Sequence, residues 1–194
     1  MGEEPRCEAD EVQPMSPIPD PGGAIADVVM EVEAHASRAG WDQPAHLFAL
    51  VETADLIERE PHLAEVLGVA AEGLTPVEQE TTSESLEELL STILWPPEVA
   101  GCAVVLEAMT VPPDADNVPD DAEAAAEYAA SHPEREEARI VAGSLRSGES
   151  YCAIRQRAHD DDDMVLAGPD LVPVLLELLQ TTLQPDPGEP ETDE

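Results

Sequence analysis

Two apolar runs on either side of a Ser147-Gly148 pair constrain the fold more than any other stretch of this chain. Residues 138–145 and 150–157 are rich in strand-forming residues, and Ser-Gly suits the positive φ angles of a two-residue hairpin turn. We therefore expect an antiparallel hairpin in which Val141 faces Ile154. This register predicts an apolar core face and a mixed outer face. The core face would hold Val141, Leu145, Cys152 and Ile154; the outer face would hold Ile140, Tyr151, Arg155 and Arg157.

The chain beyond the hairpin predicts an exposed corner and then a helix. Residues 159–163 read His-Asp-Asp-Asp-Asp, which is too charged to continue a buried strand. Gly168-Pro169-Asp170 then leads into an apolar run at 171–179 with helical spacing, where Pro173 is tolerated only in the first turn. We expect this helix to cover the core face of the hairpin.

The rest of the chain alternates helical and strand patterns. Predicted helices cover residues 24–39, 54–59, 62–67 and 122–130, and two more open at the capping-box sequences Thr75-Pro76-Val77-Glu78 and Ser85-Leu86-Glu87-Glu88. Predicted strands cover residues 46–51 and 101–111. Together with the hairpin, this order predicts an α+β domain with one mostly antiparallel, four-stranded sheet and helices packed on it.

The ends of the chain differ in composition from its middle. Residues 1–23 and 184–194 are rich in Pro, Gly, Asp and Glu and poor in large apolar residues, so we expect two disordered acidic tails. Residues 24–183 are long enough for a single domain with one core.

The formal net charge of −36 excludes several kinds of partner. Residues 24–183 carry 33 of the 44 acids, so the expected domain is itself strongly acidic and would repel phosphate backbones and anionic lipid surfaces. We expect no nucleic-acid and no membrane partner. The chain contains no Lys, which excludes lysine-based catalysis. Cys7, Cys102 and Cys152 form no close pair, and we expect a cytoplasmic protein without disulfides.

Several strings resemble a known family. Gly40-Trp41-Asp42-Gln43-Pro44 followed by Leu47-Phe48-Ala49-Leu50-Val51, and later Gly168-Pro169-Asp170-Leu171-Val172-Pro173, are similar to sequences of an uncharacterised family of small acidic actinobacterial proteins of unknown function. The resemblance covers roughly residues 24–183. It implies a single compact domain and brings no established activity.

Arginine provides the first candidate binding site. Five of the eight Arg residues fall between Arg135 and Arg157, and Arg139, Arg155 and Arg157 with Tyr151 would form an electropositive patch for a carboxylate, a phosphate or an acidic peptide. The alternative is that these cations pair with the protein's own acids. Trp41 and Trp95 each flank a proline turn, where Trp either anchors a partner or closes the edge of a core.

The acidic corner provides a candidate metal site. His159, Asp160 and Asp162 offer nitrogen and oxygen ligands for Ca²⁺, Mg²⁺ or Mn²⁺, although consecutive residues cannot all face one ion. The alternative is a solvated turn whose carboxylates pair with Arg155 and Arg157.

The sequence contains no local catalytic motif. It has no Gly-x-Ser-x-Gly, His-Glu-x-x-His or Cys-x-x-Cys sequence and no glycine-rich phosphate loop, so no catalytic residue and no cofactor are predicted. We expect a non-enzymatic, chaperone-like interaction or adaptor module that binds another protein or a second copy of itself. The competing hypothesis is a divalent-cation-dependent binding protein or hydrolase that uses the corner at 159–163.

Overall fold

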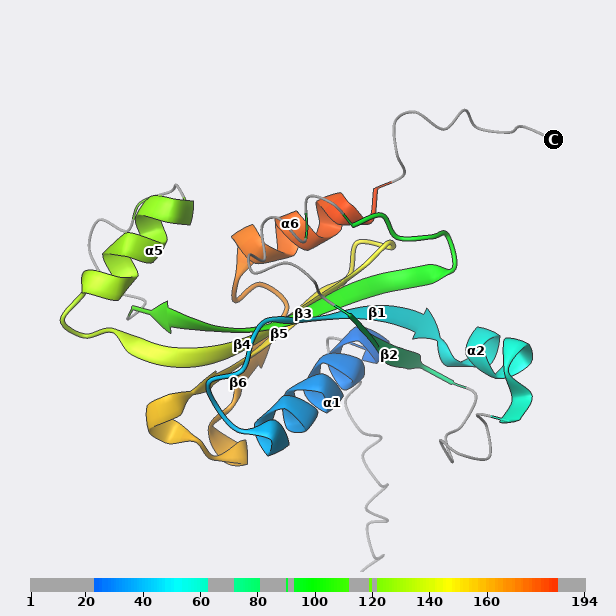
Figure 1. Ribbon diagram of the computed structural model, residues 1–194, viewed down its shortest axis with the longest axis horizontal. Coiled ribbons are helices and arrows are strands. Elements are labelled where there is room, and N and C mark those ends of the chain that lie inside the picture. The colour runs from blue at the N-terminus through cyan, green and yellow to red at the C-terminus, as the bar shows by residue number, and fades with distance from the viewer. Residues whose placement is uncertain are drawn as a thin grey trace, which may run out of the picture.

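The protein is built on one antiparallel sheet with helices on both faces (Figure 1). The computed structural model describes residues 23–62, 72–80, 90, 93–111, 119 and 122–184. The helices in this part are α1 (Gly23–Ala39), α2 (Thr53–Arg59), α5 (Ala122–Ser131) and α6 (Pro173–Thr182). The strands are β1 (His46–Glu52), β2 (Leu74–Gln79), β3 (Val99–Thr110), β4 (Glu136–Leu145), β5 (Ser150–Gln156) and β6 (Leu166–Gly168).

The sheet has six strands in the order β2-β1-β3-β4-β5-β6, and all neighbours are antiparallel. The α+β class is therefore confirmed, whereas the expectation of four strands is wrong. The four predicted strands form the centre of the sheet, and the two that the sequence analysis missed are its edges. Edge strands pair on one side only, so their sequences are under weaker constraint.

Strand β2 replaces a predicted helix. The Thr75-Pro76-Val77-Glu78 sequence has the spacing of a helix start, but Leu74–Gln79 pairs along the full length of β1 instead. Pro76 lies opposite Leu50 and lacks an N–H group, which an edge strand tolerates and a central strand does not. Long-range pairing has overridden the local helix signal here. At the other edge, β6 pairs with β5 through only three residues.

The hairpin forms as predicted, but its register is shifted by one residue. The Leu145 N–H donates to the Glu149 carbonyl (2.8 Å), so the loop has three residues, and Gly148 adopts the positive φ of 95°. Val141 consequently faces Ala153, and Ile154 faces Ile140. The predicted assignment of side chains to the two faces is therefore wrong. A register shift of one residue moves the side chains of one strand to the opposite face relative to its partner strand.

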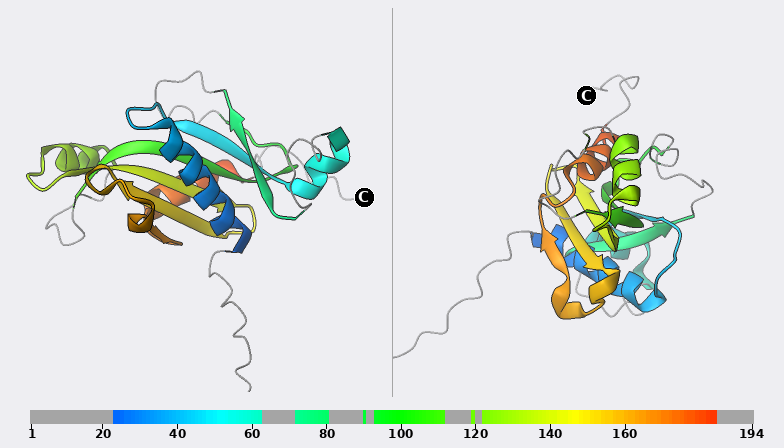
Figure 2. Two further views of the ribbon diagram at one scale, coloured as in Figure 1. Left: turned by 90° about the horizontal axis from the view of Figure 1, so that it is seen from below. Right: turned by 90° about the vertical axis from the view of Figure 1, so that its left-hand side faces the viewer.

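Both faces of the sheet are buried. On one face α1 packs Ile25, Val29 and Val32 against a layer that includes Val141 and Tyr151. Figure 2 shows α1 crossing the strands of this face. On the other face Leu176 and Leu179 of α6 cover Leu47, Cys102, Val104, Ala142 and Cys152. The helix predicted after the hairpin is present, with Pro173 in its first turn.

Arg146 ties α6 to the sheet. Its guanidinium donates to the carbonyls of Trp95 (3.0 Å), Val99 (2.8 Å) and Leu183. The last of these carbonyls follows the C-terminus of α6, where a cation is favourable. This arrangement holds the helix with one stripe buried and the opposite stripe facing outward.

Several predictions fall outside the described residues: the tails, most of the helical stretch at 62–67 and most of the helix that begins at Ser85. Cys102 and Cys152 are free, and their strands β3 and β5 are separated by β4. Burial raises the pKa of the Cys102 thiol to about 11 and also raises the pKa of Cys152. Among the helices of the described part, none is long and apolar enough to cross a membrane.

Candidate functional site

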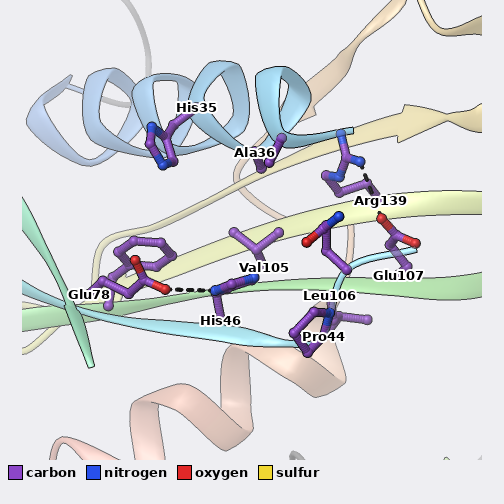
Figure 3. Close-up of a pocket in the computed structure, with 12 residues that line it drawn as sticks. His35, Ala36, Pro44, His46, Glu78, Val105, Leu106, Glu107 and Arg139 are labelled. Atoms are coloured by element: carbon purple, nitrogen blue, oxygen red, sulfur yellow. Dashed lines mark hydrogen bonds and ion pairs between the residues drawn. The ribbon is translucent and has the colours of Figure 1, made fainter. Parts of the chain in front are cut away.

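A row of charged residues crosses the sheet on the α1 face. Glu107 on β3 lies opposite Arg139 on β4, and Arg139 lies opposite Arg155 on β5. Arg139 donates to Glu107 at 3.2 Å (Figure 3). Arg139 and Arg155 are only 1% and 2% exposed. Two like charges directly opposite each other destabilise a sheet, so each guanidinium needs its own acceptors.

Arg155 obtains its acceptors from α1 and from the acidic corner. It forms a two-pronged ion pair with Glu33 on α1, with Nε–Oε1 and Nη2–Oε2 distances of 2.6 and 3.0 Å. Asp160 and Asp162 accept further hydrogen bonds at 3.3 and 2.8 Å. The hydrogen bonds that Arg155 donates to Glu33, and to a smaller extent the one it donates to Asp162, raise the pKa of Arg155 above its ordinary value. Glu33 is itself buried, so this pair is shielded from water.

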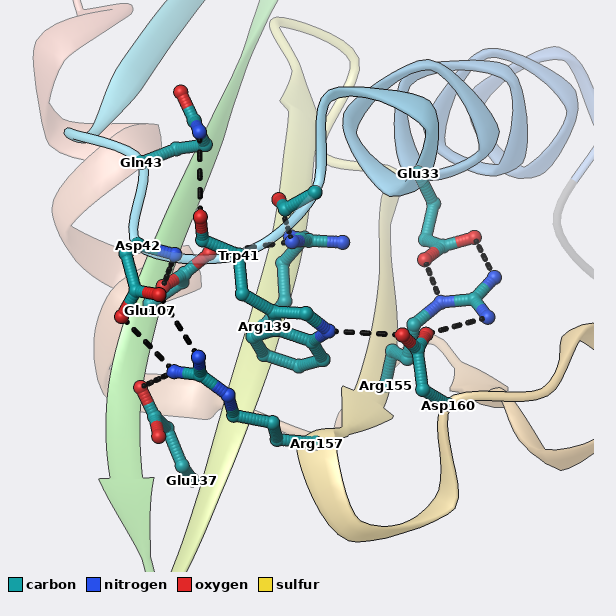
Figure 4. A network of polar contacts seen from close by, with 11 residues as sticks. Glu33, Trp41, Asp42, Gln43, Glu107, Glu137, Arg139, Arg155, Arg157 and Asp160 are labelled. Carbon is teal, nitrogen blue, oxygen red and sulfur yellow. Dashed lines mark hydrogen bonds and ion pairs between the residues drawn. The ribbon is translucent and has the colours of Figure 1, made fainter.

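Arg139 obtains its acceptors from the loop that follows α1. Its Nη2 donates to the Gly40 carbonyl, and its guanidinium lies 4.4 Å from the centre of the Trp41 ring (Figure 4). Trp41 in turn donates from Nε1 to Asp160 at 2.9 Å, which is the main cause of the lowered pKa of Asp160. A cation over the face of Trp is attracted by the negative face of the ring. Trp41 therefore joins Arg139 to the acidic corner.

Arg157 follows the last residue of β5 and lies two positions beyond Arg155. Its guanidinium contacts both carboxylate oxygens of Asp42, at 3.0 and 2.8 Å, and Glu137 at 2.9 Å. The hydrogen bond from Arg157 lowers the pKa of Asp42. Asp42 has a positive φ of 65°, and its N–H donates to Glu107 at 2.8 Å. The loop between α1 and β1 is thus held in place by the arginines below it.

The structure brings together most of the predicted binding residues, which we name the arginine cluster: Arg139, Arg155, Arg157 and Trp41. Each of the three cations is matched by acids of the same chain, as the alternative interpretation describes. Tyr151 lies apart from them in the core beneath α1. Trp95 lies in the core on the α6 side, where its Nε1 donates to Thr182 at 3.0 Å. A role of these residues in binding stays a prediction.

The predicted metal ligands lie at the edge of the arginine cluster. Asp160 and Asp162 face Arg155, which supplies the positive charge that a metal ion would supply, and His159 is exposed. Among the described residues, the acidic side chains close enough to share an ion are instead Asp42, Glu107 and Glu137, whose oxygens lie within 4.8 Å of one another. Arg157 and Arg139 already neutralise this group. A metal at His159, Asp160 and Asp162 stays a prediction.

A hollow of about 80 Å³ lies beside the arginine cluster, between the C-terminal half of α1 and the sheet (Figure 3). Its wall is mostly apolar and includes Ala36, Phe48 and Val105. The polar groups that line it are His35, Gln43, His46, Glu78, Glu107 and Arg139. His46 Nδ1 and Glu78 Oε1 lie 2.7 Å apart. The sequence analysis missed the histidines and Glu78 because three different elements, α1, β1 and β2, bring these groups together and no local motif marks them.

An apolar surface lies on the opposite side of the sheet. Val174 and Leu178 are four residues apart on α6 and therefore share its outer face, and Leu171 precedes them by one turn. Leu166 on β6 shares the α6 side of the sheet with Ile154. We name these four residues the α6 surface: Leu166, Leu171, Val174 and Leu178. Their exposed fractions lie between 41% and 57%. Contiguous exposed apolar patches mark interaction sites more often than single exposed residues do.

Residues 25–184 of the chain match the model of the PPA1309-like protein family. The chain belongs to this family. The family is uncharacterised, so it brings no activity to either surface. No curated protein and no solved structure matches the chain. The actinobacterial origin expected from the sequence stays a prediction.

Proposed function

We propose that this protein is a non-enzymatic interaction module whose α6 surface binds a basic amphipathic segment of another protein. The observation that carries the proposal is the α6 surface itself. Two of its side chains, Val174 and Leu178, are held outward on a helix whose other stripe is firmly buried at Leu176 and Leu179. Burying one large aliphatic side chain contributes about 1.5–3 kcal/mol, so a few such contacts supply useful affinity.

The negative charge around the α6 surface favours a positively charged partner. The whole chain has a net charge of −36, and residues 163–184 contain three acids and no Arg or Lys. Asp163, Asp170 and Glu177 are exposed neighbours of the apolar residues. A partner with apolar anchors flanked by Lys and Arg would be attracted at long range and then held by apolar contact. A second copy of this chain would instead bring the same negative charge to the interface, which argues against a homodimer here.

The interior supports a cytoplasmic location for this module. Cys102 and Cys152 are buried free thiols, and the raised pKa of both keeps them in the unreactive thiol form. Free thiols persist in the reducing environment of a cytosol.

The test uses a synthetic helical peptide with Leu on one face and Lys on the other, and its Leu/Glu counterpart. Fluorescence anisotropy should show binding of the Lys peptide alone. The double variant Val174→Ser, Leu178→Ser should raise its Kd at least about tenfold, because the apolar contacts are lost while the charge is unchanged. Val77→Ser is the matched control, since Val77 is an exposed apolar residue on the opposite edge of the sheet.

Two results would contradict the proposal. Equal binding to wild type and the double variant would show that charge attraction alone holds the peptide. Sedimentation velocity gives the second result: a wild-type dimer that becomes monomeric in the double variant would assign the α6 surface to self-association instead.

A further inference from the structure

Strand β2 has one open side. Among the described strands it pairs only with β1, so it forms an edge of the sheet, beside α1 (Figure 2). The Thr53 N–H donates to the Gly73 carbonyl (3.0 Å), which continues the register of the β1 pair. Hydrogen-bonded positions alternate along an antiparallel pair, so the odd-numbered residues of β2 bond to β1. The main-chain groups of Leu74, Pro76 and Glu78 therefore point away from β1.

The place of Pro76 agrees with this alternation. Its ring removes an N–H group at a position that makes no bond to β1. Leu74 and Glu78 keep outward N–H groups, and all three residues keep outward carbonyls. Among the described segments, only β1 forms main-chain hydrogen bonds with β2. A row of open donors and acceptors of this kind is a template for a further strand.

A second hollow, of about 340 Å³, lies next to this edge, between the N-terminal half of α1 and β2. Val28, Leu74 and Pro76 give it apolar walls, and Asp27 and Glu31 line it one helical turn apart on α1. Ligand sites usually combine apolar walls with a few polar groups in this way. Opposite residues of neighbouring strands share a face of the sheet, so an added strand would place every second side chain in this hollow.

We infer that the open edge of β2 and this hollow, which together we name the β2 groove, bind an extended basic segment of another protein as an added strand. This mode of recognition takes its affinity from main-chain hydrogen bonds and its specificity from alternate side chains. The main-chain groups of Leu74, Pro76 and Glu78 supply the hydrogen bonds, and the hollow receives the alternate side chains.

The charge of the β2 groove selects the occupant. Glu72 adds a third acid to Asp27 and Glu31, and no Arg of the described part lines the hollow. None of these three acids has an ion-pair partner among the described residues. A Lys side chain would lay its aliphatic stem on the apolar wall and bring its ammonium group to the acids. A second copy of β2 would instead bring its own acids, Glu72 and Glu78, to the same place.

The β2 groove is separate from the α6 surface. Its side chains lie on the α1 face of the sheet, where Leu74 packs against the core beneath α1. Val77 lies opposite Ala49, which belongs to the core on the α6 side, so its side chain faces away from the groove. The two surfaces can therefore be tested independently, and the failure of one does not decide the other.

The experiment measures amide hydrogen exchange of the full chain by NMR, with and without the amidated peptide Thr-Lys-Thr-Lys-Thr-Lys, whose six residues match the length of β2. Without peptide, the outward amides of Leu74 and Glu78 should exchange fast and the Val77 amide, which bonds to β1, should be protected. Saturating peptide should slow exchange at Leu74 and Glu78 at least about tenfold and leave Val77 unchanged. Charge attraction alone would not protect these two amides.

A proline variant tests the main-chain contact from the side of the protein. Glu78→Pro removes an outward N–H and no bond to β1, as Pro76 already does, so the sheet should persist. It should raise the Kd of the peptide at least about fivefold relative to Glu78→Thr. Glu78→Thr is the matched control, because it loses the same carboxylate and keeps the N–H.

A charge variant tests the hollow. Asp27→Asn with Glu31→Gln should raise the Kd of the peptide at least about threefold, because two exposed acids of the hollow are lost. Asp163→Asn with Glu177→Gln removes the same charge beside the α6 surface and should leave the Kd unchanged.

The inference is overturned if the peptide leaves the Leu74 and Glu78 amides unprotected, if Glu78→Pro binds like Glu78→Thr, or if both charge variants weaken binding equally. Protection of the two amides without peptide also overturns it. Protection that is lost on dilution would assign the edge to a second copy of the chain, and protection at every concentration would assign it to another segment of the same chain.

Discussion

The two faces of the sheet carry similar apolar cores but differ at their borders. On the α1 face the core ends at the arginine cluster, where each of the three cations is paired with acids and Glu33 is buried with Arg155. On the α6 face the core ends at the α6 surface, where four aliphatic side chains face solvent. The arginine cluster, which we call the polar border, finds most of its hydrogen-bond and ionic partners within the chain. The α6 surface, which we call the apolar border, leaves its side chains exposed. This difference is the reason that we propose intermolecular contact on the α6 side and expect the arginine cluster to contribute mainly to stability.

The largest expected effect comes from breaking the buried ion pair. Glu33→Gln leaves the Arg155 guanidinium buried with only the half-exposed Asp160 and the almost fully exposed Asp162 as acidic partners. We expect the free energy of unfolding, measured by urea denaturation, to fall by about 3 kcal/mol, the lower end of the range for a broken buried pair.

A double-variant cycle sharpens this result. Glu33→Leu combined with Arg155→Met removes both charges, so it should cost less than the sum of the two single substitutions. If the double variant costs as much as the sum of the two single substitutions, Glu33 and Arg155 do not stabilise each other.

A smaller effect is expected in acid. The hydrogen bond from Trp41, with the charge of Arg155, lowers the pKa of Asp160 below its ordinary value of 3.8. The unfolded chain therefore binds a proton more readily than the folded protein. The contribution of Asp160 to stability is present above about pH 4 and disappears as the pH falls through the lower pKa of the folded state.

Unfolding curves at a series of pH values test this dependence. Below pH 4 the wild type should lose stability faster than Asp160→Asn, whose side chain does not titrate. Asp163→Asn is the control, since Asp163 forms no ion pair among the described residues. Parallel curves for wild type and Asp160→Asn would show that the ionisation of Asp160 does not stabilise the fold through the arginine cluster.

The smallest effect is expected on the apolar border. Val174→Ser and Leu178→Ser should each lower the free energy of unfolding by no more than about 1 kcal/mol, because about half of each side chain is already exposed. Leu179→Ala on the buried stripe of the same helix should cost about 2–5 kcal/mol. A large cost at Val174 or Leu178 would mean that this border serves the fold of the monomer rather than a partner.

The arginine cluster shows how far the sequence leads toward a site. The scarcity of basic residues and the predicted hairpin pointed to Arg139, Arg155 and Arg157, and the adjacent proline turn pointed to Trp41. The nearby partners Asp160 and Asp162 were within reach of the sequence, but Glu33 and Glu107 were not, because they lie 122 and 32 residues away from the arginines that they contact. The hollow was missed for the same reason.

The sequence by itself determined the elements with strong local patterns. The apolar periodicity of α1, the β-branched runs of β3, β4 and β5, and the Pro173 start of α6 place these elements close to their observed bounds. Tertiary structure decided the rest. Pairing with β1 made a strand of Leu74–Gln79, and a three-residue loop shifted the hairpin by one position. A local pattern reports the preference of a segment, whereas register and edge pairing depend on hydrogen bonds and packing between segments that are distant in the chain.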